Sequence, residues 1–163
     1  MIVIALGANL PSRVGAPRNT LAAALARLSA QGVRIAKVSS YYVTKAWPDP
    51  TDPAFVNAVA RVETEHAPRE LMKILHGIEE HFGRTRGKRN APRTLDIDLI
   101  DYDGRVEPGP PELPHPRLSD RAFVLVPLAE IVPDWKHPAT GQSMNALIGA
   151  LRDEALAIEK LGT

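Results

Sequence analysis

The chain has 163 residues, of which 44% are hydrophobic, and its twenty Lys and Arg against nineteen Asp and Glu give a formal net charge of +1. This length predicts a single domain over residues 1–163, and the near-neutral balance excludes a global field that would attract nucleic acid or a membrane surface. The absence of cysteine excludes disulfides, thiolate zinc sites and a cysteine nucleophile. Because there is no basic leader and no long apolar segment, we expect a cytoplasmic protein, with a monomer as the default.

The apolar pattern of the first half predicts three strands and one helix. Leu21, Leu25 and Leu28 form the single apolar stripe of an amphipathic helix, whereas the strands contain runs of β-branched and aromatic residues. In chain order the predicted elements are a strand over 2–7, a helix over 17–32, a strand over 33–44, a proline-rich loop over 45–53 and a strand over 55–64.

The second half predicts a second helix and a fourth strand, followed by a helical tail. In chain order the predicted elements are a helix over 68–83, a polar loop over 84–94, a strand over 95–102, a proline-rich loop over 107–116, helices over 121–131 and 143–153, and a last segment of unassigned type. The order β-α-β-β-α-β is that of a ferredoxin-like α/β (α+β) sandwich, here with additional C-terminal helices.

The strand predicted over 95–102 carries two carboxylates on one face. Because successive strand side chains point to opposite faces, Asp96 and Asp98 project together about 6.5–7 Å apart, while Leu95, Ile97 and Leu99 enter the core. Two anionic groups repel and are costly to desolvate, so they favour a positive partner. Paired Mg²⁺ ions bridged by Asp oxygens are a recurring device for phosphoryl chemistry. The alternative is an exposed strand face with solvated aspartates.

The loop directly before this strand is basic. It contains Arg84, Arg86, Lys88, Arg89 and Arg93 and no acidic residue. Guanidinium groups bind phosphate oxygens in a bidentate manner, so a polyphosphate would explain both the loop and the neighbouring carboxylates. A solvated basic turn and a nucleic-acid patch are the alternatives. At the other end of the strand, Asp101 and Asp103 are predicted to lie in a turn before Gly104.

The run from Arg89 to Ile100, RNAPRTLDIDLI, closely resembles the signature of the 6-hydroxymethyl-7,8-dihydropterin pyrophosphokinase family. Further matches follow the family order along nearly the whole chain. They are GANL (7–10), SSYYVT (39–44), FVNA (55–58), LPHP (113–116) and RAFVLVPL (121–128). The long signature is highly specific, and six ordered matches are hard to obtain by chance.

The resemblance implies a magnesium-dependent, ATP-binding transferase of folate biosynthesis that moves the β,γ-diphosphate of ATP to the hydroxymethyl oxygen of the pterin and releases AMP. It implies that Asp96 and Asp98 bind two Mg²⁺ ions, with Asp98 as a proton acceptor. Arg84 and Arg93 correspond to catalytic residues that bind phosphate and neutralise charge. His115 and Arg121 match family positions on the nucleotide side.

The resemblance also implies a pterin pocket. Phe55 and Phe123 match the pair that stacks on the pterin, Asn57 matches the residue that reads its polar edge, and Thr44 lines the same pocket. Glu79 matches an acidic family position, although a salt bridge on the helix surface explains it equally well.

The sequence departs from the family pattern in two loops. Asn90 stands where several members have a tryptophan nearby, and Lys45 and Trp47 occupy a loop where smaller residues or proline are common. These changes affect the expected closure of the loops and not the reaction class. Two alternatives to the kinase are a two-metal nucleotidyltransferase and a non-catalytic ferredoxin-like binding module.

Overall fold

The computed structural model describes residues 1–85 and 87–162, so Arg86 of the basic loop lies outside the described residues. The elements in chain order are β1 (Ile2–Ala8), α1 (Pro17–Ala30), β2 (Arg34–Val38), β3 (Tyr42–Thr44), β4 (Phe55–Glu63), α2 (Pro68–His81), β5 (Asp96–Tyr102), η1 (Leu118–Asp120), α3 (Ala122–Ile131), α4 (Met144–Ala150), α5 (Arg152–Leu156) and β6 (Glu159–Lys160).

The strands form one antiparallel sheet in the order β5-β1-β4-β3-β6, and β2 also pairs with β4. The ferredoxin-like α/β fold predicted from the sequence is therefore confirmed, with three strands (β2, β3 and β4) between α1 and α2 where two were predicted. The central strand β1 brings its neighbours into a fixed register, in which Gly7 pairs with Asn57 of β4 on one side and with Asp96 of β5 on the other.

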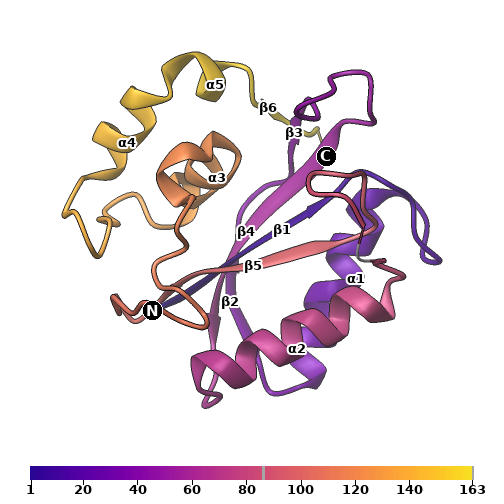
Figure 1. The fold of residues 1–163 in the computed structure, drawn as a ribbon, viewed down its shortest axis with the longest axis horizontal. Coiled ribbons are helices and arrows are strands. Elements are labelled where there is room, and N and C mark those ends of the chain that lie inside the picture. The colour runs from indigo at the N-terminus through magenta and orange to yellow at the C-terminus, as the bar shows by residue number, and fades with distance from the viewer. Residues whose placement is uncertain (86, 163) are drawn as a thin grey trace.

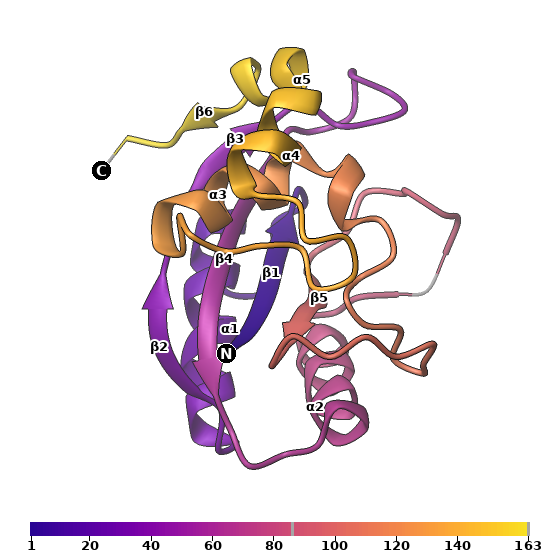
Figure 2. The same ribbon diagram turned by 90° about the vertical axis from the view of Figure 1, so that its left-hand side faces the viewer.

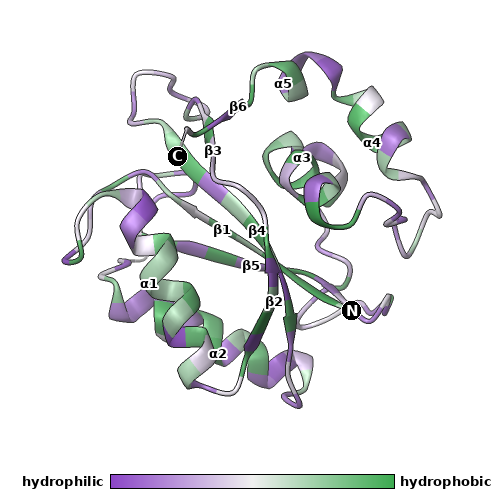
Figure 3. Cartoon of the chain, turned by 180° about the vertical axis from the view of Figure 1, so that it is seen from behind, coloured by the Kyte–Doolittle hydropathy of each residue, from purple (hydrophilic) through white to green (hydrophobic). Residues whose placement is uncertain are grey.

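Helices cover both faces of the sheet (Figures 1 and 2). The pair α1 and α2 lies on one face, and α3 with α4 and α5 lies on the other. Figure 3 shows hydrophobic and hydrophilic residues interspersed along α1 and α2, as expected for helices with one buried side. Alternation along β1 supplies both cores, because Ile4 packs with the α1 and α2 leucines whereas Val3 packs against α3.

The single strand predicted over 33–44 is wrong, because the chain breaks into β2 and β3. The break is stabilised at Ser39, whose N–H donates to the Val59 carbonyl at 2.9 Å while its hydroxyl accepts the Val59 N–H at 3.0 Å. A side-chain oxygen thus replaces a main-chain acceptor, and regular pairing resumes only at Tyr42.

The prediction that Asp101 lies in a turn is also wrong, whereas Asp103 does lie in the turn before Gly104. Asp101 belongs to β5 and is buried, and its carboxylate accepts the Trp135 indole N–H at 2.8 Å. The pairing of β1 with β5 shifts register between Val3 and Ile4. This β-bulge places Asp101 on the face covered by the C-terminal helices.

The helix predicted over 143–153 is two helices, α4 and α5, which meet at Leu151. The unassigned last segment contains the end of α5 and then β6, whose Glu159 and Lys160 pair with Val43 and Tyr42. The chain therefore returns to the edge of the sheet beside Thr44. In the described ranges, none of the helices has both the length and the apolar character needed to cross a membrane.

Candidate active site

Two cavities meet above the strand β5. The first, of about 500 Å³, is called the aromatic cavity because Phe55, Phe123 and Trp47 line it. The second, of about 540 Å³, is called the basic cavity because Arg84, Lys88 and Arg89 line it. Six residues line both cavities and form what we call the shared wall, namely Asn90, Arg93, Asp96, Asp98, Arg117 and Arg121.

The aromatic cavity brings together all four residues predicted to bind the pterin, which are Thr44, Phe55, Asn57 and Phe123. They come from β3, β4 and the first turn of α3. The Asn57 amide donates to the Thr44 hydroxyl at 2.9 Å, which fixes the direction of the amide.

The floor of the aromatic cavity depends on Gly7. Gly7 lies between Asn57 and Asp96 in the sheet register, and a Cβ at this position would stand 2.9 Å from the Asn57 amide oxygen. Such a contact would displace the amide. The glycine of the GANL turn therefore keeps the floor open between the aromatic side and the carboxylates.

The basic cavity contains the four residues predicted for the nucleotide side, namely Arg84, Arg93, His115 and Arg121. Two of these residues, Arg93 and Arg121, also belong to the shared wall. The structure therefore gathers the predicted residues into two neighbouring groups that are joined at Asp96 and Asp98.

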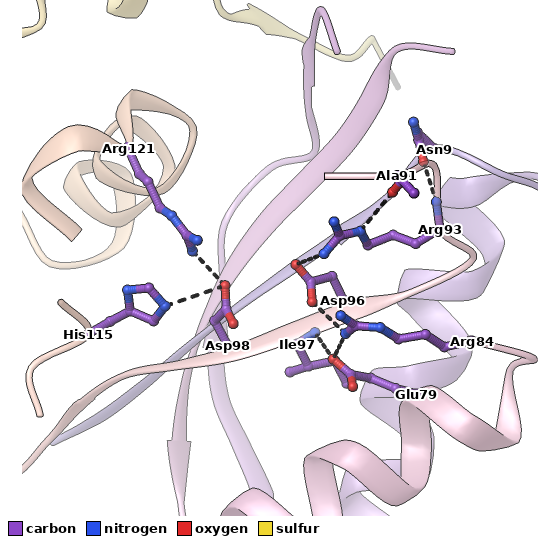
Figure 4. A network of polar contacts seen from close by, with 10 residues as sticks. All are labelled: Asn9, Glu79, Arg84, Ala91, Arg93, Asp96, Ile97, Asp98, His115 and Arg121. Atoms are coloured by element: carbon purple, nitrogen blue, oxygen red, sulfur yellow. Dashed lines mark hydrogen bonds and ion pairs between the residues drawn. The ribbon is translucent and has the colours of Figure 1, made fainter. Parts of the chain in front are cut away.

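Both carboxylates of the shared wall are bound by arginines (Figure 4). Asp96 accepts from Arg84 at 2.6 Å and from Arg93 at 3.1 Å, and Asp98 accepts from Arg121 at 2.6 Å. The Asp side chains are about a quarter exposed, 26% for Asp96 and 28% for Asp98, so these pairs are partly shielded from water. The neighbouring leucine and isoleucine side chains of β5 point into the core, as predicted from the alternation.

Glu79 is not part of a surface salt bridge, because its side chain is only 7% exposed. Its carboxylate accepts the Ile97 N–H at 2.7 Å and also binds the Arg84 guanidinium. Burial raises the pKa of Glu79 to about 7, against the lowering effects of the Ile97 N–H and Arg84. Glu79 thus connects α2 to β5 and orients Arg84 toward Asp96.

His115 is held with its two ring nitrogens in different roles. Its Nδ1 accepts the Arg117 N–H at 3.1 Å, so in the neutral ring the proton is on Nε2, which lies 3.9 Å from Asp98. Burial lowers the pKa of His115, opposed by the nearby Asp98 carboxylate and reinforced by Arg121 and Arg117. The neutral form therefore dominates at pH 7 and presents a donor to the shared wall.

The role of Asn9 was not predicted from the sequence, in which Asn9 was identified only as part of the GANL motif. Asn9 is 3% exposed, and its side chain accepts the Arg93 N–H at 2.8 Å and donates to the Pro53 carbonyl at 3.0 Å. It therefore ties together the two loops that flank the aromatic cavity. The sequence carries no signal for this role, because both partners of the Asn9 amide lie in loops that are distant along the chain.

Sequence reasoning also missed the outer wall of the aromatic cavity. Glu154, Ala157 and Ile158 of the C-terminal segment line it, together with Lys45 and the 68% exposed Trp47. Pairing of β6 with β3 explains how residues so far along the chain reach this place.

The model of the 7,8-dihydro-6-hydroxymethylpterin-pyrophosphokinase (HPPK) family matches residues 3–133. The chain belongs to this family. Members of this family are pterin pyrophosphokinases (EC 2.7.6.3) of folate biosynthesis. Membership of the family therefore decides against the nucleotidyltransferase and the binding-module alternatives.

Individual relatives agree with the HPPK assignment. The chain is 39% identical over 148 residues to a 2-amino-4-hydroxy-6-hydroxymethyldihydropteridine pyrophosphokinase of Synechocystis sp., covering 90% of this chain and 73% of the relative. It is 35% identical to the enzyme of the same name from Pseudomonas aeruginosa, covering 95% and 94% of the two chains.

The fold also matches solved HPPK structures. A Plasmodium falciparum HPPK-DHPS chain superposes with a TM-score of 0.73 at 13% identity, covering 99% of this chain and 48% of that chain. The chain thus spans about half the length of that longer protein, and the likeness concerns the fold alone.

Proposed function

We propose that the aromatic cavity binds 6-hydroxymethyl-7,8-dihydropterin, that the basic cavity binds ATP, and that Asp96 and Asp98 hold two Mg²⁺ ions between the two substrates. The observation that carries this proposal is the shared wall, because both carboxylates line both cavities. A diphosphate that leaves one substrate for the other must pass such a boundary. The residues that line the aromatic cavity range from Ala5 to Ile158, which supports one pyrophosphokinase domain over residues 1–163.

The residues present fit magnesium bound together with a nucleotide. In the described part of the chain, no group of three or more His, Cys, Asp or Glu residues is arranged to enclose a metal ion. Mg²⁺ is commonly held by only one or two carboxylates, with phosphate oxygens and water completing its shell. Asp96 and Asp98 supply that number of carboxylates, on one strand face that is open to both cavities.

The arginines of the site exchange partners when the substrates bind. In this structure, Arg84 and Arg93 neutralise Asp96, and Arg121 neutralises Asp98. Bound Mg²⁺ supplies positive charge to the carboxylates and phosphates and lowers the pKa of a coordinated hydroxyl. The guanidinium groups are then free to bind phosphate oxygens and to stabilise the charge that develops as the diphosphate moves.

The chemistry is a displacement at the β-phosphorus of ATP. The hydroxymethyl oxygen of the pterin forms the new bond to this phosphorus, the bond to the bridging oxygen of the α-phosphate breaks, and AMP leaves with that oxygen. Asp98, which lines both cavities, accepts the hydroxyl proton. The Nε2–H of His115 lies 3.9 Å from the same carboxylate, where its dipole favours the ionised form.

The aromatic cavity is suited to a flat bicycle with a polar edge. Phe55 and Phe123 offer aromatic faces, and the fixed Asn57 amide offers a donor and an acceptor in the plane between them. Such a cavity recognises the edge of the ring and leaves its hydroxymethyl substituent directed to the shared wall.

The product of ATP cleavage tests this function. The purified protein with Mg²⁺, ATP and the hydroxymethyldihydropterin is expected to release AMP and a pterin diphosphate, detected by chromatography. Release of pyrophosphate would instead indicate nucleotidyl transfer and overturn the proposal. Asp98→Asn is expected to lose at least a thousandfold in turnover, because removing a metal ligand removes several kcal/mol of charge stabilisation, about 4 kcal/mol for that factor. Asp134→Asn, at an exposed aspartate outside both cavities, is the matched control.

A further inference from the structure

Arg117 differs from the other arginines of the shared wall because its charge is unpaired. Arg93 and Arg121 each bind a carboxylate of β5. For the residues that the structure describes, no hydrogen bond or ion pair is made by the Arg117 guanidinium, although the residue is half-buried. Asp120, which lines the aromatic cavity, does not pair with it. A half-buried guanidinium without a protein acceptor keeps all of its donors available to a ligand.

The backbone of Arg117 is nevertheless firmly positioned. The preceding His115 donates its N–H to the Ile100 carbonyl of β5 at 2.9 Å, and its Nδ1 accepts the Arg117 N–H. The following Leu118 is fully buried in the core beneath α3. The segment on both sides of Arg117 is therefore anchored, and only the long side chain is free to reach a ligand.

Arg117 also differs from the remaining cations of the site by its location. Arg84, Lys88 and Arg89 line the basic cavity alone and Lys45 lines the aromatic cavity alone, whereas Arg117 lines both cavities. A group in this position is within reach of a phosphate in either cavity. Arg117 can bind a phosphate without first breaking an ion pair, whereas Arg93 and Arg121 must first release their carboxylates.

We propose that Arg117 binds the diphosphate group on both sides of the reaction, first as the β,γ-diphosphate of ATP and then as the diphosphate of the pterin product. This proposal rests on the function proposed above, because it requires that the two cavities take the two substrates. Arg117 then follows the transferred group across the shared wall, while Arg84 remains with the nucleotide. No bond is made or broken by Arg117, which contacts phosphate oxygens through charged hydrogen bonds.

Calorimetric titration of four ligands distinguishes this role from a general effect on the site. The ligands are a non-hydrolysable α,β-methylene analogue of ATP, the pterin diphosphate, unphosphorylated hydroxymethylpterin and AMP, all with Mg²⁺. Arg117→Ala is expected to bind both diphosphate ligands at least tenfold more weakly and to bind AMP and hydroxymethylpterin with unchanged affinity. Arg84→Ala is expected to weaken only the ATP analogue, and Arg117→Lys to recover part of the loss.

The controls separate the failure of this proposal from that of the proposed function. Arg69→Ala removes one positive charge from an exposed position on α2 and is expected to change none of the four affinities. Unchanged affinity of Arg117→Ala for the pterin diphosphate overturns the proposal, as does an equal loss for all four ligands. If the wild-type protein binds neither the ATP analogue nor hydroxymethylpterin, the proposed function itself fails.

Discussion

The aromatic and basic cavities have similar volumes but are built in different ways. The aromatic cavity rests on β1, β3, β4 and α3, so the sheet register determines where Asn57 and Phe55 point. The basic cavity is walled largely by residues 84–85 and 87–93, whose position depends on a few polar contacts, among them those of Asn9 and Glu79. Under the proposed function, recognition of the pterin would thus be set by the sheet, whereas binding of phosphate would be set by charges that can change partners.

Among the changes that affect one cavity and not the other, the largest expected effect concerns Glu79, which supports the basic side. Because its pKa is raised to about 7 by burial, the folded protein keeps a proton that the unfolded chain loses above its ordinary pKa of 4.5. The free energy of unfolding therefore falls as pH rises from about 5 to 7, by up to about 3 kcal/mol. Urea denaturation of Glu79→Gln is expected to show a flatter pH profile over this window.

An unchanged slope in Glu79→Gln would show that Glu79 is ionised in the folded protein throughout this range. Glu70→Gln is a suitable control, since Glu70 is exposed on the same helix and pairs with Lys73 at the surface. It removes a carboxylate from α2 without touching either cavity.

Phe123→Ala tests ligand binding in the aromatic cavity most directly. Loss of one stacking face, together with its apolar contact, is expected to weaken hydroxymethylpterin binding about 50-fold, since stacking and burial together contribute roughly 2–3 kcal/mol. The affinity for the ATP analogue is expected to remain within a factor of two. Phe123 is 37% exposed, so the substitution leaves most of the core contacts intact. A parallel loss for the nucleotide would contradict the separation of the two cavities.

Arg84→Ala is expected to weaken nucleotide binding and to leave pterin binding unchanged, the opposite of Phe123→Ala. The expected loss is about 20-fold for the ATP analogue and none for hydroxymethylpterin, because a charged hydrogen bond contributes roughly 1.5–3 kcal/mol. Titration of both ligands measures the two affinities. Should pterin binding fall to the same extent, Arg84 would act through Asp96 on both cavities and not through phosphate alone.

Gly7→Ala sharpens the comparison with the smallest expected change. The added Cβ pushes the Asn57 amide away from its place beside Thr44, so KM for the pterin is expected to rise about fivefold, equivalent to roughly 1 kcal/mol. KM for ATP is expected to stay constant, since the basic cavity does not include this residue. Equal KM values for wild type and variant would mean that the amide is not needed for pterin recognition.

The sequence predicted those parts of the site that depend on local periodicity. Asp96 and Asp98 share a face because strand side chains alternate, and Phe55 and Asn57 line one cavity for the same reason. The same rule failed at Asp101, because a bulge changes the phase of alternation and cannot be recognised from one sequence.

The remaining features depend on contacts between distant segments. Glu79 is buried because β5 and Arg84 supply partners for it, and these lie beyond the helix that contains it. Arg117 belongs to the shared wall because His115 is bonded to β5 and Leu118 enters the core. Nothing in the local pattern PHPRLSD distinguishes this arginine from a solvated one.

The central claim is that Asp96 and Asp98 bind the metal that joins nucleotide to pterin. Calorimetric titration of the ATP analogue with and without Mg²⁺, in wild type and in Asp96→Asn/Asp98→Asn, tests it most directly. We expect Mg²⁺ to raise the wild-type affinity at least tenfold and to leave the affinity of the double variant nearly unchanged. A double variant that keeps the full Mg²⁺-dependent gain would contradict the account.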